Sequence, residues 1–279
     1  MSSNKVTIFL QGGLGNQLFQ YAFGLSLANK HKLDVRYSTI LLDLKLPGVT
    51  KRSFALHGLL ENHEIVGFLK SLLLLMLSQL NKKYLINDKN YKKINKVKYV
   101  IGYFQDYEVV EENWNEIEYR MGKSQLYAEL VNVNSSVEKY IGIHVRRGDY
   151  ISSDSANKYH GLLSNEYFVK SVKLCQKQEK LNSIKIVTDD ETEVMELIGD
   201  LEKDQNEVKV YNGNLVSDLK MLINSKVLIL SNSSFSWWAA FISSKKTGTK
   251  IFAPHPWVVT KDTNLTKLLP ENWEKIERD

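Results

Sequence analysis

The chain has 279 residues, enough for one large domain or two of ordinary size, each with its own core. Its 43% hydrophobic and 25% charged residues, without a low-complexity tract, exclude a disordered or fibrous protein. The net charge of +5 permits an anionic ligand or membrane surface without requiring nucleic acid. The single cysteine, Cys175, excludes an intrachain disulfide and fits a reducing compartment.

The N-terminal part begins with a strand, a turn and a helix. The apolar run VTIFL (6–10) predicts a buried strand, and GGLGNQ (12–17) predicts a tight turn. Apolar residues at helical spacing over 18–31 predict a helix, and LDVRYS (33–38) predicts a second strand. The first apolar run is short and has no small-residue cleavage site behind it, so we expect no signal peptide.

The most apolar segment spans residues 65–80. It contains Gly67, Lys70 and Ser71 and falls short of the ~20 apolar residues that cross a bilayer. We expect a buried helix here, with a position at a membrane surface as the alternative.

Residues 82–98 follow with seven lysines against one aspartate. Such a run predicts a solvated face. Two alternatives are contact with an anionic membrane through residues 65–98 and, in a non-catalytic protein, binding of a polyanion. No RNA- or DNA-binding module is evident, so we expect no nucleic-acid partner.

Short apolar strands alternate with helical patterns in the rest of the chain. We expect strands at 98–105, 139–145, 183–190, 207–211, 226–230 and 249–254, and helices at 167–180, 191–202, 215–225 and 234–243. This alternation predicts βαβ units and a parallel sheet covered on both faces. A polar stretch at 132–140 is the expected boundary between two domains, residues 1–137 and 138–279.

The stretch IGIHVRRGDY (141–150) places His144, Arg146, Arg147 and Asp149 at the end of a predicted strand. Ligands of open parallel sheets lie outside the carboxyl ends of the strands. Arginine suits phosphate because its planar fork donates two parallel hydrogen bonds and its charge does not titrate away. We expect one arginine to bind a diphosphate while its neighbour points across the strand, to Asp149 or the core edge. The structural alternative is a pair of interdomain salt bridges.

Thr188, Asp189 and Asp190 follow another predicted strand and would share this edge of the sheet. Two carboxylates here can bind a metal, a ribose or a guanine edge, or can cap the next helix. Because no histidine or third acid lies at ligand spacing, the sequence disfavours a metal.

The third cluster, SNSSFSWWAA (231–240), follows a strand and opens a helix. Unpaired N–H groups at a helix start attract anions. The alternative is a serine cap, with Phe235, Trp237 and Trp238 in the core. A single cap needs a single serine, whereas four occur between positions 231 and 236.

Gly12, Gly13 and Gly15 let the backbone turn tightly after the first strand and admit a ligand closely. Their spacing departs from the dinucleotide fingerprint G-x-G-x-x-G, and no Walker lysine follows. The turn alone is therefore a weak functional signal.

Together these blocks resemble the α-1,2-fucosyltransferases of glycosyltransferase family 11, in their bacterial form. The similar segments, in the expected order, are GGLGNQLFQYAFGLSLA (12–28), IGYFQDY (101–107), HVRRGDY (144–150), SNSSFSWWAAF (231–241) and LLPENWEKI (268–276). The resemblance covers essentially the whole chain. HVRRGDY with SNSSFSWW is its specific part, since related protein O-fucosyltransferases carry a similar glycine turn.

The resemblance implies an α/β GT-B architecture, two Rossmann-like domains facing across a cleft, and allows for a final helix packing back on the first. The C-terminal domain would hold GDP-β-L-fucose, and the N-terminal domain a galactose-terminated glycan of a surface polysaccharide or O-antigen. Fucose would pass to a 2-hydroxyl with inversion, without a metal or other cofactor. The implied location is the cytoplasm or the inner face of its membrane. Another GDP-sugar transferase on this scaffold is the alternative.

Carried over onto the matching positions, the resemblance implies that Arg146 contacts the diphosphate and stabilises departing GDP. His144 and Asp149 would support and orient it. The implied donor-binding residues are Arg147, Asp189, Asp190, Asp218, Asn232, Ser233, Ser234 and Phe235. Those facing the cleft from the other domain are Gly13, Gly15, Asn16 and Gln17. The catalytic base stays open among Asp149, Asp154 and His144.

Overall fold

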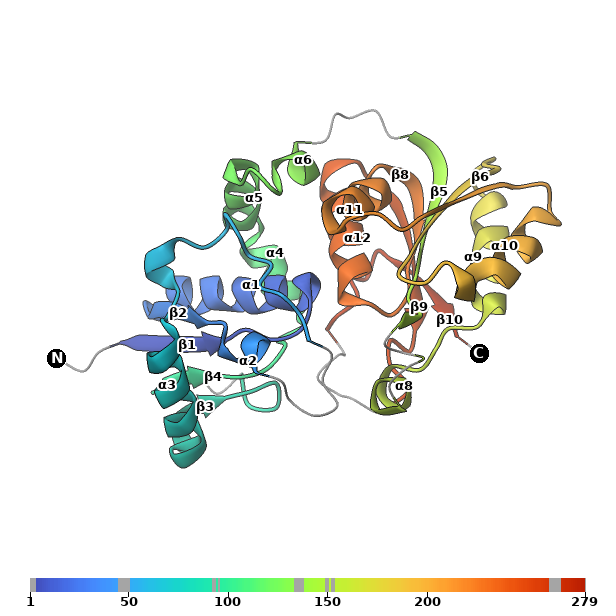
Figure 1. Ribbon diagram of the computed structural model, residues 1–279. Helices are drawn as coiled ribbons and strands as arrows, with labels where there is room; N and C mark the ends of the chain where they lie inside the picture. The colour runs from blue at the N-terminus through green and yellow to red at the C-terminus, as the bar shows by residue number, and fades with distance from the viewer. Residues whose placement is uncertain are drawn as a thin grey trace. The chain divides into compact units, whose positions relative to one another are not determined.

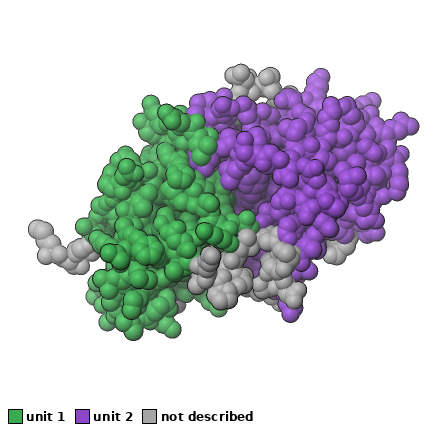
Figure 2. Space-filling view, viewed as in Figure 1, with its two compact units in different colours: residues 1–126, 263–268 green, residues 127–262, 269–279 purple. Residues whose placement is uncertain are grey.

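The computed structural model describes residues 4–44, 51–91, 94, 96–132, 138–148, 151, 154–260 and 267–278, without the side chains of 154–156. The chain divides into two compact units (Figure 2). Unit 1 comprises residues 1–126 with 263–268, and unit 2 comprises 127–262 with 269–279. Each unit is built on its own parallel β-sheet (Figure 1).

The sheet of unit 1 has four parallel strands in the order β2-β1-β4-β3. Their bounds are β1 (Lys5–Phe9), β2 (Asp34–Ser38), β3 (Leu85–Ile86) and β4 (Tyr99–Val100). β1 lies inside the sheet, and four of its five residues are buried, which accounts for its apolar sequence. The strand predicted at 98–105 is reduced to two residues.

Helices accompany this sheet in chain order. They are α1 (Leu14–His31), α2 (Ile40–Asp43), α3 (Phe68–Leu80), α4 (Tyr107–Glu112) and α5 (Trp114–Lys123), with 3-10 turns η1 (Asn62–Glu64) and η2 (Lys82–Tyr84). The turn predicted at 12–17 is shorter than expected, because α1 already begins at Leu14. Gly12 makes the turn with φ +77°, a left-handed conformation that glycine adopts without strain.

The helix predicted within residues 65–80 is present, but the prediction that it is buried is wrong. Helix α3 buries Ser71 and Ser78 and packs the partly buried Leu74, Leu75 and Leu77 on the core around Phe9, Ile40 and Tyr99. Its other leucines, its methionine and Phe68 are exposed. The helix is apolar around most of its circumference, and the small sheet beneath it can cover only one side. In the part of the chain that the structure describes, no helix is long and apolar enough to cross a membrane.

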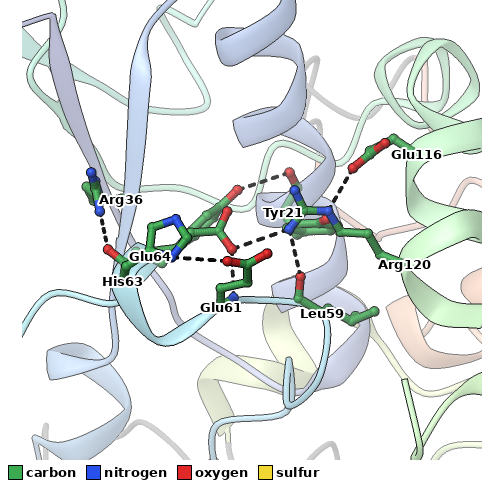
Figure 3. A network of polar contacts seen from close by, with 9 residues as sticks. Tyr21, Arg36, Leu59, Glu61, His63, Glu64, Glu116 and Arg120 are labelled. Carbon is green, nitrogen blue, oxygen red and sulfur yellow. Dashed lines mark hydrogen bonds and ion pairs between the residues drawn. The ribbon is translucent and has the colours of Figure 1, made fainter. Parts of the chain in front are cut away.

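A polar network fastens the segment before α3 within unit 1 (Figure 3). The guanidinium of Arg120 donates to the carboxylates of Glu116 (2.7 Å) and Glu64 (3.3 Å) and to the carbonyl of Leu59 (3.2 Å). Tyr21 lies beside it, and burial raises the pKa of its hydroxyl. Because all three partners of Arg120 belong to the scaffold, we assign this network a structural role.

The sheet of unit 2 has six parallel strands in the order β10-β9-β8-β5-β6-β7. Their bounds are β5 (Glu138–Val145), β6 (Ser183–Thr188), β7 (Glu207–Tyr211), β8 (Ser225–Ile229), β9 (Lys250–His255) and β10 (Glu274–Glu277). Counted from β5, the spatial order is 3-2-1-4-5-6, that of the Rossmann fold. Five of the six strands match the predicted ones.

In chain order, one helix of unit 2 precedes β5 and the others follow strands of the sheet (Figure 1). They are α6 (Ala128–Val131), α8 (Asp154–His160), α9 (Asn165–Gln176), α10 (Met195–Glu202), α11 (Leu215–Ile223) and α12 (Ser234–Lys246), with the 3-10 turn η3 (Thr192–Val194). Helix α6 packs against α11 and α12, and its Leu130 and Val131 are buried. Unit 2 therefore begins at residue 127, not at the expected 138.

The end of the chain differs from the final helix that we allowed for. The backbone N–H of Tyr107 donates to the carbonyl of Lys267 (3.0 Å), so the chain returns to unit 1 as a turn. Residues 274–277 then form β10, parallel to β9 in unit 2. Two consecutive charged residues separate Trp273 from Ile276, so this segment lacks the strict alternation that predicts a strand.

Candidate functional site

In unit 2 the three polar clusters of the sequence come together at one edge of the sheet. β5 and β8 are neighbours, and chain connections leave them in opposite directions. Such a switch point is where ligands bind in doubly wound folds. His144 lies at the end of β5, Thr188 ends β6, and Ser231 follows β8. The strand pairing confirms the prediction that these clusters share one edge of the sheet. We call this edge, formed by the carboxyl ends of β5, β6 and β8, the rim.

His144 is a buried, neutral part of this rim. Its Nδ1 lies 2.6 Å from the hydroxyl oxygen of Ser231, and its ring centroid is 5.4 Å from that of Phe235. Burial, and then the charge of Arg146, lowers the pKa of His144 to about 3. A group with that pKa is a weak general base at neutral pH. His144 therefore suits a supporting role, and the structure disfavours it as the base.

Arg146 is a partly exposed cation on the rim. Its Nη1 lies 2.8 Å from Oδ2 of Asp189, and its side chain is 20% exposed. Asp189 also accepts the backbone N–H of Arg147 through Oδ1 (2.8 Å). The carboxylate thus holds both the backbone and the guanidinium of this loop. Asp149, the expected orienting acid, lies outside the described residues. Asp189, which was expected to bind the donor, instead orients Arg146.

Arg147 points away from the rim into unit 2. Its guanidinium donates to the carbonyl of Leu163 (2.9 Å) and to Oδ1 of Asn165 (3.2 Å), and its Cζ lies 5.8 Å from the ring centroid of Phe168. Only 6% of the residue is exposed. The expectation that one arginine turns to the core edge is confirmed, whereas a direct donor contact by Arg147 is not supported.

Most serines after β8 have a structural use. Ser233 caps α12 by accepting the N–H of Phe235 (3.3 Å), and the hydroxyl of Ser236 donates to the carbonyls of Ser231 and Ser233. Ser234, the first residue of α12, is partly exposed together with Phe235. The start of α12 therefore offers Ser234 and its N–H groups to a ligand.

The remaining residues predicted around the donor hold the scaffold. The amide of Asn232 donates to the carbonyls of His160 (2.7 Å) and Gly161 (3.1 Å). Asp190 accepts the N–H of Thr192 (3.1 Å), which fulfils the capping alternative. Asp218 accepts the N–H of Gly213 (3.0 Å), while burial raises its pKa. Asp154 begins α8, and its side chain lies outside what the structure describes.

Unit 1 carries a cluster of amides where β1 and β4 end. Gln20 accepts the N–H of Gln11 (3.1 Å) and donates to the carbonyl of Gly102 (2.9 Å), so it ties the two strand ends together. The amide of Asn16 accepts from Gln105 (2.8 Å) and is partly exposed.

The glycine turn of unit 1 is open at one point. A Cβ added to Gly13 would meet nothing within 4 Å, whereas Gly15 is buried in α1. Gln17, expected to face a ligand, is buried; it donates to the carbonyls of Gly12 and Ser53 and accepts the N–H of Ala55. Gly13 and Asn16 therefore keep the predicted accessibility, and Gln17 serves as a clamp.

Across the described residues, no three His, Cys, Asp or Glu side chains gather as a metal site would require. Sequence reasoning missed Gln20, Gln105 and Asn165 as supporting residues. An amide carries no charge and occurs in many settings, so nothing in the pattern marked them.

The chain belongs to glycosyl transferase family 11, whose match covers residues 93–261, more than half of the chain. It is therefore a glycosyltransferase, and the non-catalytic alternative falls. Its two Rossmann-like units make the fold GT-B in type.

Curated relatives extend the similarity over nearly the full length. The chain is 29% identical over 302 residues to an alpha-1,2-colitosyltransferase of Escherichia coli, covering 96% of this chain and 98% of that protein. It is 24% identical to the O-antigen biosynthesis glycosyltransferase WbnK of Escherichia coli, covering 95% and 98%.

Solved structures to which the chain is similar include POFUT1 in complex with GDP-fucose, with a TM-score of 0.45 and 11% identity over 88% of this chain and 95% of that chain. The Escherichia coli heptosyltransferase WaaC with ADP has a TM-score of 0.44 and 12% identity over 98% and 93%.

Proposed function

We propose that this protein transfers L-fucose from GDP-β-L-fucose to the 2-hydroxyl of a terminal galactoside, with inversion and without a metal. The observation that carries the proposal is Arg146, which stands at the Rossmann switch point and is oriented by Asp189 at 2.8 Å. The relatives named for colitosyl transfer and O-antigen biosynthesis support a deoxyhexose donor and a polysaccharide acceptor.

The chemistry follows from where charge develops. As the sugar leaves, the anomeric carbon becomes cation-like and negative charge builds on the diphosphate. Arg146 supplies fixed positive charge there, and the start of α12 supplies N–H groups beside Ser234. His144 stays neutral in the buried layer behind, so it supports this arrangement without competing for the phosphate as a second cation.

A second donor fits the same site. Colitose is L-fucose without its 3-hydroxyl, so both sugars leave the same diphosphate and differ by one polar group. The alpha-1,2-colitosyltransferase relative favours this alternative. A site built to hydrogen-bond a hydroxyl discriminates strongly against a sugar that lacks it, so a comparison of the two donors decides between them.

The test begins with thermal denaturation of the full chain in the presence of GDP, GDP-fucose, GDP-colitose, GDP-mannose and UDP-galactose, each with and without EDTA. A ligand at 100 times its Kd stabilises the fold by about 2.7 kcal/mol. We expect GDP and GDP-fucose each to raise the melting temperature, by the same amount whether or not EDTA is present. UDP-galactose should have no effect. Fucosylation of a galactoside, located by methylation analysis, tests the linkage. No response to any guanine nucleotide, or a response abolished by EDTA, contradicts the proposal.

Gly148 provides a further prediction about the site. A Cβ added there would lie 2.4 Å from Oδ2 of Asp189, so Gly148→Ala must displace the carboxylate that holds Arg146. We expect the transfer rate to fall by about tenfold, since small misplacements of a catalytic group are costly. The matched control is Gly199→Ala on α10, where an added Cβ meets nothing within 4 Å. Equal rates for the two variants would contradict the positioning role of Asp189.

A further inference from the structure

The outer face of α3 is an apolar surface on unit 1. Leu69, Leu72, Leu73, Met76 and Leu80 recur at intervals of three, one, three and four residues, which places them on one side of a helix. Leu69 is 81%, Met76 60% and Leu80 79% exposed. The inward side combines Ser71 and Ser78 with the partly buried Leu74, Leu75 and Leu77, so the helix is apolar on its outer side as well as its inner one. We call the five outward residues the α3 face.

Lysines flank the α3 face at both ends of the helix. Lys70 is exposed near its start, and Lys82 and Lys83 are exposed in η2, which packs directly after it. Lys83 and Lys98 both lie over the ring of Tyr84, with Nζ 4.8 and 5.0 Å from its centroid. From Phe68 to Lys98 the sequence holds eight lysines and one acidic residue, Asp88.

Acidic side chains also lie on the neighbouring segments. Asp43 on α2, which packs against α3, is exposed and accepts the hydroxyl of Thr39 (3.2 Å). Asp88 accepts the backbone N–H groups of Tyr103 and Phe104, and Glu64 is paired with Arg120. With eight lysines against one acidic residue over residues 68–98, positive charge nevertheless predominates along this stretch of unit 1. An exposed apolar helix face flanked by positive charge matches a lipid bilayer with anionic headgroups, which offers an apolar layer below a negative one.

We propose that the α3 face and Lys70, Lys82 and Lys83 dock this protein on an anionic membrane surface. The helix has 13 residues, about 20 Å of length at 1.5 Å per residue, so it is too short to cross a ~30 Å core and would lie in the interface. Pairing of two copies through the α3 face is disfavoured, because a twofold contact would bring both sets of lysines together.

The experiment is flotation of the full-length protein with vesicles. One set contains equal amounts of phosphatidylcholine and phosphatidylglycerol, and the other phosphatidylcholine alone, each at low and high salt. We expect binding to the anionic vesicles at low salt, weakened by high salt. Each lysine near such a surface contributes about fivefold to partitioning, so Lys82→Gln with Lys83→Gln should weaken binding by about thirtyfold. Met76→Gln should weaken it by about tenfold.

Two controls match these variants. The adjacent pair Lys245 and Lys246 ends α12, and Lys245 also lies over an aromatic ring. Met195 on α10 is 64% exposed, close to the value for Met76. Replacement of either the pair or Met195 by glutamine should leave vesicle binding unchanged.

Three results would overturn the proposal. They are absence of binding to anionic vesicles at low salt, equal losses in the α3 and control variants, and a concentration-dependent dimer in sedimentation velocity that Met76→Gln abolishes. Transfer to a water-soluble galactoside should persist in all four variants. Its loss in unmodified protein would count against the proposed function and not against the membrane surface.

Discussion

Replacement of Arg146 by alanine is expected to lower the rate of sugar transfer by about a hundredfold or more. Its guanidinium is the positive charge that the described residues place at the switch point between β5 and β8. Removing one such charge-stabilising group typically costs about 3 kcal/mol in the transition state, which corresponds to that factor in rate. The fold should be retained, because Arg146 is partly exposed and Asp189 keeps its bond to the backbone N–H of Arg147.

Initial rates and thermal melts on the same preparation measure this effect. Arg146→Lys is the informative companion, since it keeps the charge but loses the planar fork that binds two phosphate oxygens. We expect it to fall between the wild type and Arg146→Ala. A folded alanine variant that turns over at the normal rate would show that diphosphate charge is stabilised elsewhere.

In contrast to the Arg146 variant, replacement of Arg147 by alanine should cause a large loss in the free energy of unfolding. The guanidinium is buried, and its removal leaves the carbonyl of Leu163 and the amide of Asn165 without their donor. Burial lowers the pKa of Arg147, while the charges of Glu193 and Asp189 oppose that shift. We expect a loss of about 3 kcal/mol, since buried polar groups are left unsatisfied and packing on Phe168 is lost.

For a chain of this size, that loss lowers the melting temperature by roughly 6–12 °C. Calorimetry of the ligand-free protein measures it, and Arg147→Met separates the two contributions because it keeps most of the packing and removes the hydrogen bonds. If Arg147→Ala melts like the wild type but no longer binds GDP, Arg147 contacts the donor and the inward orientation is not the functional one.

The sequence alone determined the alternating α/β pattern, five strands of the second sheet and the rim on which His144, Arg146 and Ser231 meet. These inferences rest on local signals, since buried strands need continuous apolar runs and parallel strands place their carboxyl ends together. The family could also be inferred from the sequence, because HVRRGDY and SNSSFSWW are each an unbroken run of residues that can be recognised without the fold.

Only the tertiary structure decided which of the neighbouring charged residues serve the site. The sequence places Arg146 and Arg147 side by side just after β5, but their guanidinium groups diverge. That of Arg146 pairs with Asp189, whereas that of Arg147 donates to Leu163 and Asn165. The orienting acid, Asp189, lies 43 positions after Arg146 and is brought near by the pairing of β5 with β6.

Helix α3 gives the same lesson in unit 1. Its composition predicted burial, yet burial depends on how much surface the rest of the fold offers. Only Leu74, Leu75 and Leu77 pack on the core around Phe9, Ile40 and Tyr99, while the outer leucines stay exposed. A sequence specifies which residues can be buried by their own chemistry. Which of them are buried is decided by partners distant in the chain, because packing is a property of the assembled layers.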